Sequence, residues 1–309
     1  MKKKVLSSIL AMGLALSCFA GCGAKNDAPA AESKQEAAEE TAKSETEKEE
    51  KAEPEAKADG DLTVVSLAPS VTEILFAIGA GDEVVGRTDY CNFPAEAASV
   101  ESIGTYSAPN MELIVSKSPD LVIASDFIDE NIQKQLEDCG AEVYVVHASD
   151  VNEIENEILT IGEKTGHKDG AETVVEGMKA TSKEIEDKAA GIEKEKSVFF
   201  DLGSYYTAGP GSFLNNVLTD IHVINIAADT GEAWPQLSVE NIVSANPDVY
   251  ISTFTPADEL RAVSGFASLE CMKDENLKVL DADLADRVQR AGPRIVDAEK
   301  ELMELIYGK

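Results

Sequence analysis

A segment of 13 residues occurs twice in this chain, and this repeat constrains the fold more than any other feature. Glu112–Ala124 and Glu240–Ser252 align at a constant offset of 128 residues, with 7 of 13 positions identical. Each copy has an apolar pattern of helical spacing, then Pro-Asp, then a run of mostly aliphatic residues. This order predicts a short helix, a turn and a buried strand. We therefore expect two similar lobes.

Short β-rich runs alternate with amphipathic segments from Leu62 onward. The alternation predicts an α/β fold, with mainly parallel sheets covered by helices. Ser70-Val-Thr-Glu73 has the pattern of a capping box that opens a helix, with Ile74, Leu75 and Ile78 on its buried face. The expected strands are Leu62–Leu67, Leu121–Ser125, Glu142–His147, Val198–Leu202, Asp248–Thr253 and Leu277–Asp281.

A longer helix is expected between the two copies of the repeat. Residues 170–196 contain no Pro, and apolar residues recur there at helical spacing with charges elsewhere. About 25 residues would span about 37 Å, which is enough to cross from one lobe to the other. An ordinary long surface helix is the alternative.

The N-terminus has the pattern of an export signal. Lys2, Lys3 and Lys4 precede an apolar stretch, Val5–Phe19, which is shorter than the roughly 20 residues of a membrane-spanning helix. The end of the stretch, Phe-Ala-Gly-Cys22, resembles a lipobox, although Phe19 stands where Leu is usual. This predicts a lipoprotein signal peptide over residues 1–22. An acyl chain such as palmitate on Cys22 would then anchor the protein outside the bacterial cell membrane. A plain cleavage site is the alternative.

The remaining chain divides by composition. Residues 23–60 are rich in Ala, Glu, Lys, Ser and Thr, which predicts a disordered acidic tether. The folded part is expected to contain an N-terminal lobe over 61–167, a bridging helix over 168–196 and a C-terminal lobe over 197–309.

Several classes of function are disfavoured. With 27 Lys plus Arg against 58 Asp plus Glu, the net charge of −31 argues against nucleic acid as a partner. The chain lacks G-x-S-x-G, H-E-x-x-H and P-loop motifs, so we expect neither an enzyme nor catalytic residues. Three Cys after Cys22 leave at least one thiol free, and neither these nor the three His have metal-site spacing. We expect no metal site, no zinc or manganese receptor, and no cofactor.

Four separated segments resemble one family. They are Ser66–Gly81, Val84–Pro94, Trp234–Val243 and Gly292–Asp297. Together they resemble the substrate-binding proteins of ABC importers for vitamin B12 and ferric siderophores, and the resemblance covers essentially all of 61–309. It implies two Rossmann-like lobes joined by one long rigid α-helix, the class III periplasmic-binding-protein fold. It also implies a monomer that captures a small ligand between the lobes and delivers it to an ABC permease dimer.

The resemblance implies a corrinoid site lined by aromatic residues from both lobes. Flat rings suit a corrinoid, which is a broad apolar disc fringed with amides, while a few polar groups fix its orientation. For each aromatic, the alternative is ordinary core filling. For Arg290, the alternative is a solvated face that it shares with Arg287 and Arg294. The ligand-binding residues that match the family are Tyr90, Tyr106, Tyr206, Trp234, Asp286 and Arg290.

One position departs from the vitamin B12 pattern. Ser125 stands where a Trp is expected, with Phe127 close by. Within the same class of binding protein, a ferric siderophore or haem is the alternative ligand. Anionic iron chelates favour several cationic side chains, which this acidic chain has few of. Haem would suit an axial Tyr, for which Tyr205 and Tyr206 are candidates.

The resemblance also implies a docking role for the first residue of each repeat copy. Proteins of this family present one surface Glu per lobe to arginines of the two permease subunits. The matching residues are Glu112 and Glu240, each in a first helical turn after an N-cap at Asn110 or Ser238. Stabilisation by the helix dipole is the alternative reason for a carboxylate there.

Overall fold

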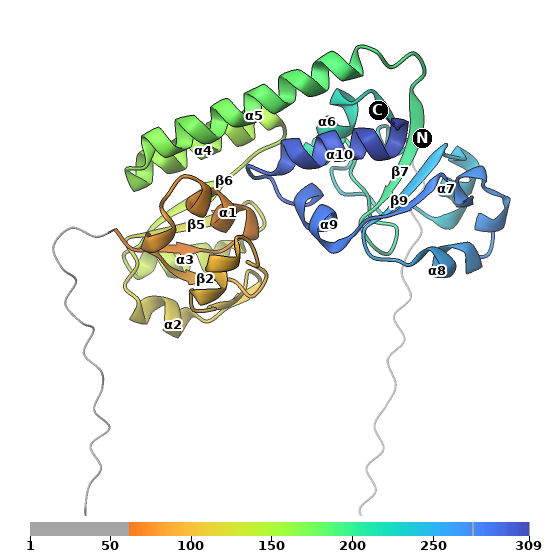
Figure 1. Cartoon of the computed structure of the whole chain (residues 1–309). Coiled ribbons are helices and arrows are strands. Elements are labelled where there is room, and N and C mark those ends of the chain that lie inside the picture. The colour runs from red at the N-terminus through yellow and green to blue at the C-terminus, as the bar shows by residue number, and fades with distance from the viewer. Residues whose placement is uncertain (1–61, 274, 309) are drawn as a thin grey trace, which may run out of the picture. The chain divides into compact units, whose positions relative to one another are not determined.

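The computed structural model of this chain describes residues 62–273 and 275–308 (Figure 1). These residues belong to one compact unit. The predicted signal peptide, the lipidated Cys22 and the tether over 23–60 lie outside the described residues. Across 62–273 and 275–308, no helix combines the length and the apolar character that crossing a membrane requires.

The N-terminal lobe is built on a parallel four-stranded sheet with the order β2-β1-β5-β6. Its register pairs Val64 with both Val84 and Leu121, and Leu121 with Glu142. The strands are β1 Val64–Ser66, β2 Val84–Arg87, β5 Leu121–Ser125 and β6 Glu142–Val146. The lobe also contains α1 Pro69–Ala77, α2 Met111–Ser116, α3 Glu130–Asp138 and a hairpin of β3 Gly104–Thr105 with β4 Ala108–Pro109.

The C-terminal lobe repeats this plan with the order β10-β9-β7-β8, again all parallel. Its central strands carry fully buried aromatics, Phe199 and Phe200 on β7 and Tyr250 on β9. The strands are β7 Lys196–Asp201, β8 Val223–Asn225, β9 Val249–Ser252 and β10 Leu277–Val279. The helices are α6 Phe213–Asp220, α7 Val239–Ala245, α8 Ala257–Ala262 and α9 Ala282–Val288.

The prediction of a two-lobed α/β fold with parallel sheets is confirmed, and all six predicted strands are present within a few residues. Four strands were missed, β2 and β8 of the two parallel sheets and β3 and β4 of the hairpin. Each is only two to four residues long. Runs of this length carry too little periodicity to separate a strand from a loop.

The repeated segment has the same local structure in both lobes. α2 leads into β5, and α7 leads into β9. Between helix and strand, Ser118 and Asn246 occupy equivalent positions and both adopt a left-handed backbone, with φ of 45° and 46°. Each precedes a Pro, so the chain turns sharply and then enters the strand.

The Asp of each Pro-Asp pair ties this turn to a neighbouring strand. The Oδ2 atom of Asp120 accepts hydrogen bonds from the backbone N–H and the hydroxyl of Thr63, at 2.9 and 2.8 Å. The Oδ2 atom of Asp248 accepts the same two bonds from Ser197, at 2.8 and 2.9 Å. The repeated Asp therefore helps to hold β1 beside β5 in one lobe and β7 beside β9 in the other.

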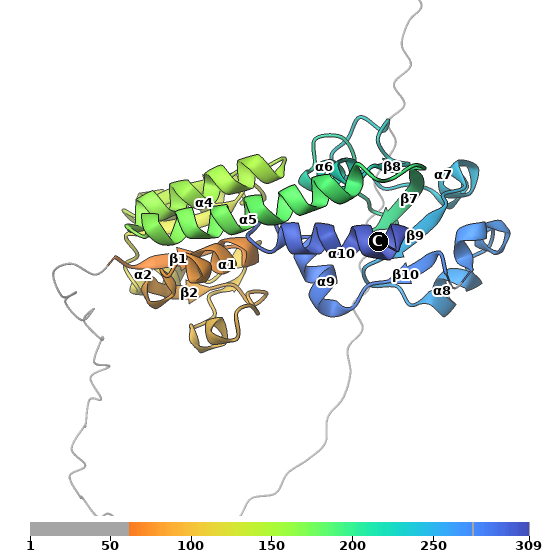
Figure 2. The same ribbon diagram turned by 45° about the horizontal axis from the view of Figure 1, so that its top comes forward.

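Helix α5, Lys168–Ala189, connects the lobes. It packs beside α4, Val151–Thr165, and contacts both α1 of the N-terminal lobe and α10, Ile295–Tyr307 (Figure 2). Close packing at its start depends on Gly170, where a Cβ atom would lie 2.0 Å from the carbonyl oxygen of Ile78.

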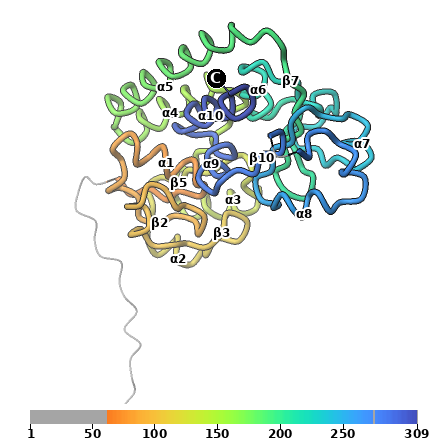
Figure 3. The backbone as a smooth tube through the Cα atoms, turned by 45° about the vertical axis from the view of Figure 1, so that its right-hand side comes forward, coloured from red at the N-terminus to blue at the C-terminus, as the bar shows by residue number. Residues whose placement is uncertain are grey.

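α5 ends seven residues earlier than the predicted bridging segment, 168–196. The helix stops at Ala189, Gly191 lies in the turn that follows, and β7 begins at Lys196. Gly lowers helix stability and favours such ends. The smooth trace in Figure 3 shows α5 leading through this turn into β7.

The predicted capping box at Ser70–Glu73 is wrong. Helix α1 starts at Pro69 after Ala68, whose side chain makes no cap. Proline fits the first helical position because its φ is already helical and its missing N–H has no partner there. Ser70 therefore lies inside the helix, and Glu73 is buried within it. Ile74, Leu75 and Ile78 are buried, as expected.

Candidate functional site

Large aromatic side chains remain exposed where parallel strands end. Those that are 41–63% exposed are Tyr90, Phe93, Tyr106, Phe127, Tyr206 and Phe254. Tyr90 and Phe93 follow β2, Phe127 follows β5, Tyr206 follows β7 and Phe254 follows β9. Open α/β sheets bind ligands beyond the carboxyl ends of their strands. Five of these six rings therefore follow strand ends that favour a binding site, and Tyr106 lies in the β3–β4 turn.

Trp234 contacts aromatic rings of both lobes. It lies in the loop before α7, half-buried, with its ring 5.9 Å from that of Phe213 and in T-shaped geometry. Its other aromatic neighbour is Phe127 of the N-terminal lobe, at 6.4 Å between ring centroids. Trp234 is therefore a loop residue whose partly buried side chain packs against the core and also approaches the other lobe.

The predicted aromatics form separate groups. Tyr90 and Tyr106, the latter in the β3–β4 turn, lie 6.5 Å apart between ring centroids. Tyr206 forms a β-bridge with Gln236, two residues from Trp234. Among the described residues, no ring of the Tyr90–Tyr106 pair stacks on Trp234.

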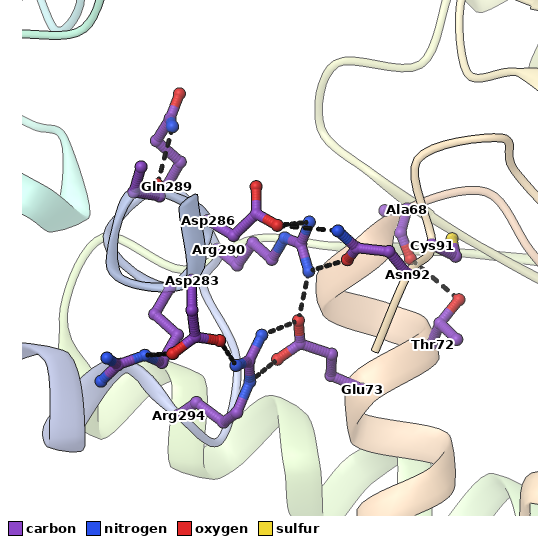
Figure 4. Close-up of polar contacts among 12 residues, drawn as sticks. Ala68, Thr72, Glu73, Cys91, Asn92, Asp283, Asp286, Gln289, Arg290 and Arg294 are labelled. Carbon is purple, nitrogen blue, oxygen red and sulfur yellow. Dashed lines mark hydrogen bonds and ion pairs between the residues drawn. The ribbon is translucent and has the colours of Figure 1, made fainter. Parts of the chain in front are cut away.

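The predicted polar residues Asp286 and Arg290 pair with each other and with the N-terminal lobe (Figure 4). The Nη2 atom of Arg290 lies 2.9 Å from the carboxylate of Asp286. Its Nη1 atom donates to Asn92 Oδ1 at 2.8 Å and to Glu73 Oε1 at 2.7 Å. Asn92 in turn donates from Nδ2 to Asp286 at 2.8 Å. These contacts link α1 and the loop after β2 with α9 and the residues that follow it.

A second arginine binds the same carboxylate. Arg294 donates from Nε and Nη2 to the two oxygens of Glu73, both at 2.7 Å, and from Nη1 to Asp283 at 2.8 Å. Burial alone would lower the pKa of Arg294, but its pairing with Glu73 and Asp283 raises it above the usual value. Its guanidinium carbon lies 3.8 Å from the centre of the Phe93 ring, a cation–π contact.

Arg287 does not form a solvated face. Its side chain is largely buried and donates to Asp283 at 2.7 Å and to Glu301 at 2.6 Å. The three arginines thus form a network of ion pairs, and they differ in the lobe to which their partners belong. Arg290 and Arg294 contact the N-terminal lobe, whereas the partners of Arg287 belong to the C-terminal lobe.

The remaining candidates lie elsewhere. Glu112 and Glu240 are exposed in the first turns of α2 and α7. Asn110 and Ser238 cap these helices as predicted, accepting hydrogen bonds at 3.0 and 3.2 Å. Tyr205 is half-buried against Phe266 at 5.8 Å, so of the two candidate axial tyrosines only Tyr206 is exposed.

Two cavities lie away from the aromatics. One of about 410 Å³ is lined by α2 and α3 and includes Glu112. The other, of about 330 Å³, is lined by residues of α4, α5, α6 and α10, including Glu155, Asp220 and Glu299. Burial raises the pKa of Glu299 to about 8, with Asp220 adding to the effect.

Sequence reasoning missed Glu73, Asn92, Phe93 and Phe254 as members of this site. For the two phenylalanines a signal existed, since each follows a short β-rich run by a few residues and the ends of parallel strands are favoured for binding. Glu73 was missed because its sequence pattern indicated a capping box. Its partners lie 217 and 221 positions further along the chain, beyond any local pattern.

Two parallel-sheet lobes, a helix in contact with both, and paired side chains where the lobes meet define a two-lobed solute-binding protein. The model of the family described as periplasmic binding protein matches residues 64–284. The chain belongs to this family, whose members serve ABC importers as binding components and are not enzymes.

Individual relatives agree with this assignment. An ABC transporter substrate-binding lipoprotein of Bacillus subtilis, named YvrC, is 38% identical over 79% of each chain. A vitamin B12-binding protein of Salmonella choleraesuis is 30% identical over 77% of this chain and 88% of its own. Among solved structures, the haem-binding protein RhuT of Roseiflexus has a TM-score of 0.72 at 25% identity, covering 81% of this chain and 99% of its own. The family and the lipoprotein name of the Bacillus relative point to an extracytoplasmic location.

Proposed function

We propose that this chain captures a corrinoid between its lobes and delivers it to an ABC permease. The observation that carries this proposal is the contact between Phe127 and Trp234, which belong to different lobes. Phe127 follows the strand after which the vitamin B12 pattern has a Trp, so a phenylalanine two residues past Ser125 supplies a ring in that region. Flat apolar rings from both sides suit a corrinoid disc.

The other ligand contacts in this proposal are Tyr90, Tyr106 and Tyr206 for the disc, with Asp286 and Arg290 for its amide fringe. All three tyrosines are roughly half-exposed. Asp286 and Arg290 offer both an acceptor and donors, which amide groups need. Relatives named as vitamin B12-binding or cobalamin-binding proteins support this choice of ligand.

Binding is tested by adding cobalamin, cobinamide, haemin and a ferric siderophore separately to the detergent-solubilised full chain. Cobinamide or cobalamin should raise the melting temperature, and the increase should grow with ligand concentration. A shift with haemin or the ferric chelate, and none with either corrinoid, would reassign the ligand.

Haem or a ferric siderophore is the second candidate. The exposed phenol of Tyr206 favours haem, because a tyrosinate can serve as an axial iron ligand. The similarity to a haem-binding protein of Roseiflexus supports the same reading. A Tyr206→Phe variant separates the ligands. It should weaken haemin binding and change its visible spectrum, while corrinoid binding should change little.

Docking on the permease is proposed to use Glu112 and Glu240. Their exposure and their equivalent positions in the two repeats support a pair of contacts with two related subunits. We also propose that residues 1–22 direct export, that a lipid on Cys22 anchors the protein, and that residues 23–60 tether the folded lobes. Metabolic labelling with a radioactive fatty acid tests the anchor. Label on the wild type and none on a Cys22→Ser variant is expected.

A further inference from the structure

The buried carboxylate of Glu73 is the point where the two lobes are joined by charge. The side chain of Glu73 is 2% exposed. It accepts three hydrogen bonds of 2.7 Å, one from Arg290 and two from Arg294. Glu73 lies on α1 of the N-terminal lobe, and both arginines follow α9 of the C-terminal lobe (Figure 4).

No local structural role explains this carboxylate. Glu73 is the fifth residue of α1, past the helix start, and it makes no cap. A buried carboxylate is costly unless it is paired, and here its cations come from the other lobe. The chain between the arginines also lies against α1, since a Cβ at Gly292 would be 3.5 Å from the carbonyl oxygen of Ser70.

Glu73 also determines what Arg290 can do. The guanidinium of Arg290 is shared among Glu73, Asp286 and Asn92. That of Arg294 is shared between Glu73 and Asp283. Arg287 also pairs with Asp283 and with Glu301, so three cations of this network face four carboxylates. An anionic ligand that approached Arg290 would have to compete with Glu73 for it, and it would also meet an excess of negative charge.

We propose that Glu73 is a positioning and specificity-determining residue of the ligand site. It holds Arg290 and, through it, Asp286 in place across the junction of the lobes. It also neutralises the arginines, so that the site favours an uncharged, amide-bearing ligand over one with carboxylates. This inference rests on the proposed corrinoid function, and it assigns the charge selectivity of that same site.

The test compares the affinities of cobinamide and haemin in the wild type, Glu73→Gln and Asp283→Asn. Both substitutions remove one acid from the same network, but Asp283 pairs only with arginines of its own lobe. Glu73→Gln should shift the ratio of the two dissociation constants at least about 10-fold towards haemin, because it frees a cation and loosens Arg290. Asp283→Asn should shift the ratio less than about 3-fold.

Asn92→Ala keeps the test decisive if Glu73→Gln does not fold. Asn92 is exposed, so its loss should leave the melting temperature nearly unchanged. It contacts both Arg290 and Asp286, and the ratio should move the same way by about 3-fold. An unchanged ratio in Asn92→Ala and in any folded Glu73 variant overturns the inference. Failure of the proposed function is recognised separately, because the wild type itself would then bind no corrinoid.

Discussion

The ring of Phe127 in the N-terminal lobe lies 6.4 Å from the ring of Trp234 in the C-terminal lobe. Trp234 also rests on Phe213 within its own lobe. The Trp234 ring therefore packs against the core of its own lobe and also contacts the other lobe. Phe127 is 62% exposed and is therefore much less buried than Trp234. The two rings should therefore respond differently to truncation.

Trp234→Ala should weaken ligand binding by roughly 1–3 kcal/mol, since aromatic anchors dominate such sites. It should also lower the melting temperature, because the contact with Phe213 is lost. Phe127→Ala should weaken binding with almost no change in melting temperature. Tyr144→Ala is the matched control, a half-buried aromatic of β6 outside the proposed site, and it should reduce stability alone. Unchanged affinity in both site variants would remove these rings from the site.

Reversal of both docking acids, Glu112→Lys with Glu240→Lys, should abolish uptake of labelled ligand by cells while binding by the purified protein persists. A lysine facing a permease arginine replaces attraction with repulsion, which costs several kcal/mol. The control reverses Glu130 and Glu259, which are exposed first-turn acids of α3 and α8.

If Glu112 and Glu240 served only the helix dipole, both double variants would transport normally. Each would then lose only about 0.3–1 kcal/mol of stability per helix. Surface level and ligand affinity are measured alongside, so that a loss of uptake reflects docking.

Glu299 should make the protein less stable as pH rises. Its pKa is raised from 4.5 to about 8 in the folded chain, first by burial and then by Asp220. Between these values the folded state holds a proton that the unfolded state has released, so the free energy of unfolding falls as pH increases. Glu299→Gln should remove this slope and stabilise the protein at pH 8 by on the order of 1–4 kcal/mol.

Urea unfolding at pH 5 and pH 8 measures this effect. Glu186→Gln is the control, because Glu186 lines the same cavity but is exposed. An unchanged slope in Glu299→Gln would show that this carboxyl ionises normally in the folded protein.

The aspartates of the repeat should contribute similarly to both lobes. Asp120→Ala and Asp248→Ala each remove two hydrogen bonds to the start of a strand, and each should lower the free energy of unfolding by about 1–3 kcal/mol. Asp258→Ala should have little effect, since that side chain is 99% exposed. A cost for only one of Asp120 and Asp248 would mean that the two repeats are not equivalent in energy.

The sequence predicted the lobes well because the information is local. Each 13-residue segment, with an N-cap two residues before it, specifies a capped helix, a turn and a strand, and the structure contains all three twice. β2, β3, β4 and β8 were missed because runs of two to four residues have no measurable period. The bridging helix was predicted too long because Gly191, which follows its end, was given no weight.

The site was only partly predictable for a different reason. Exposed aromatics after strands follow a positional rule, although Phe93 and Phe254 were overlooked. Glu73 obeys no such rule. Its partners are set by how α1 meets the segment after α9, and the local pattern Ser-x-x-Glu pointed to another role.

The intrinsic fluorescence of Trp234 tests the central claim most directly, because it is the only tryptophan of the chain. Cobinamide, which absorbs visible and near-ultraviolet light, is titrated into the full-length protein while this single emission is recorded. The account predicts saturable quenching with an affinity that matches the concentration dependence of the thermal shift. A thermal shift without any change in Trp234 emission would place the ligand away from the Phe127–Trp234 contact, and the absence of both signals would contradict corrinoid binding.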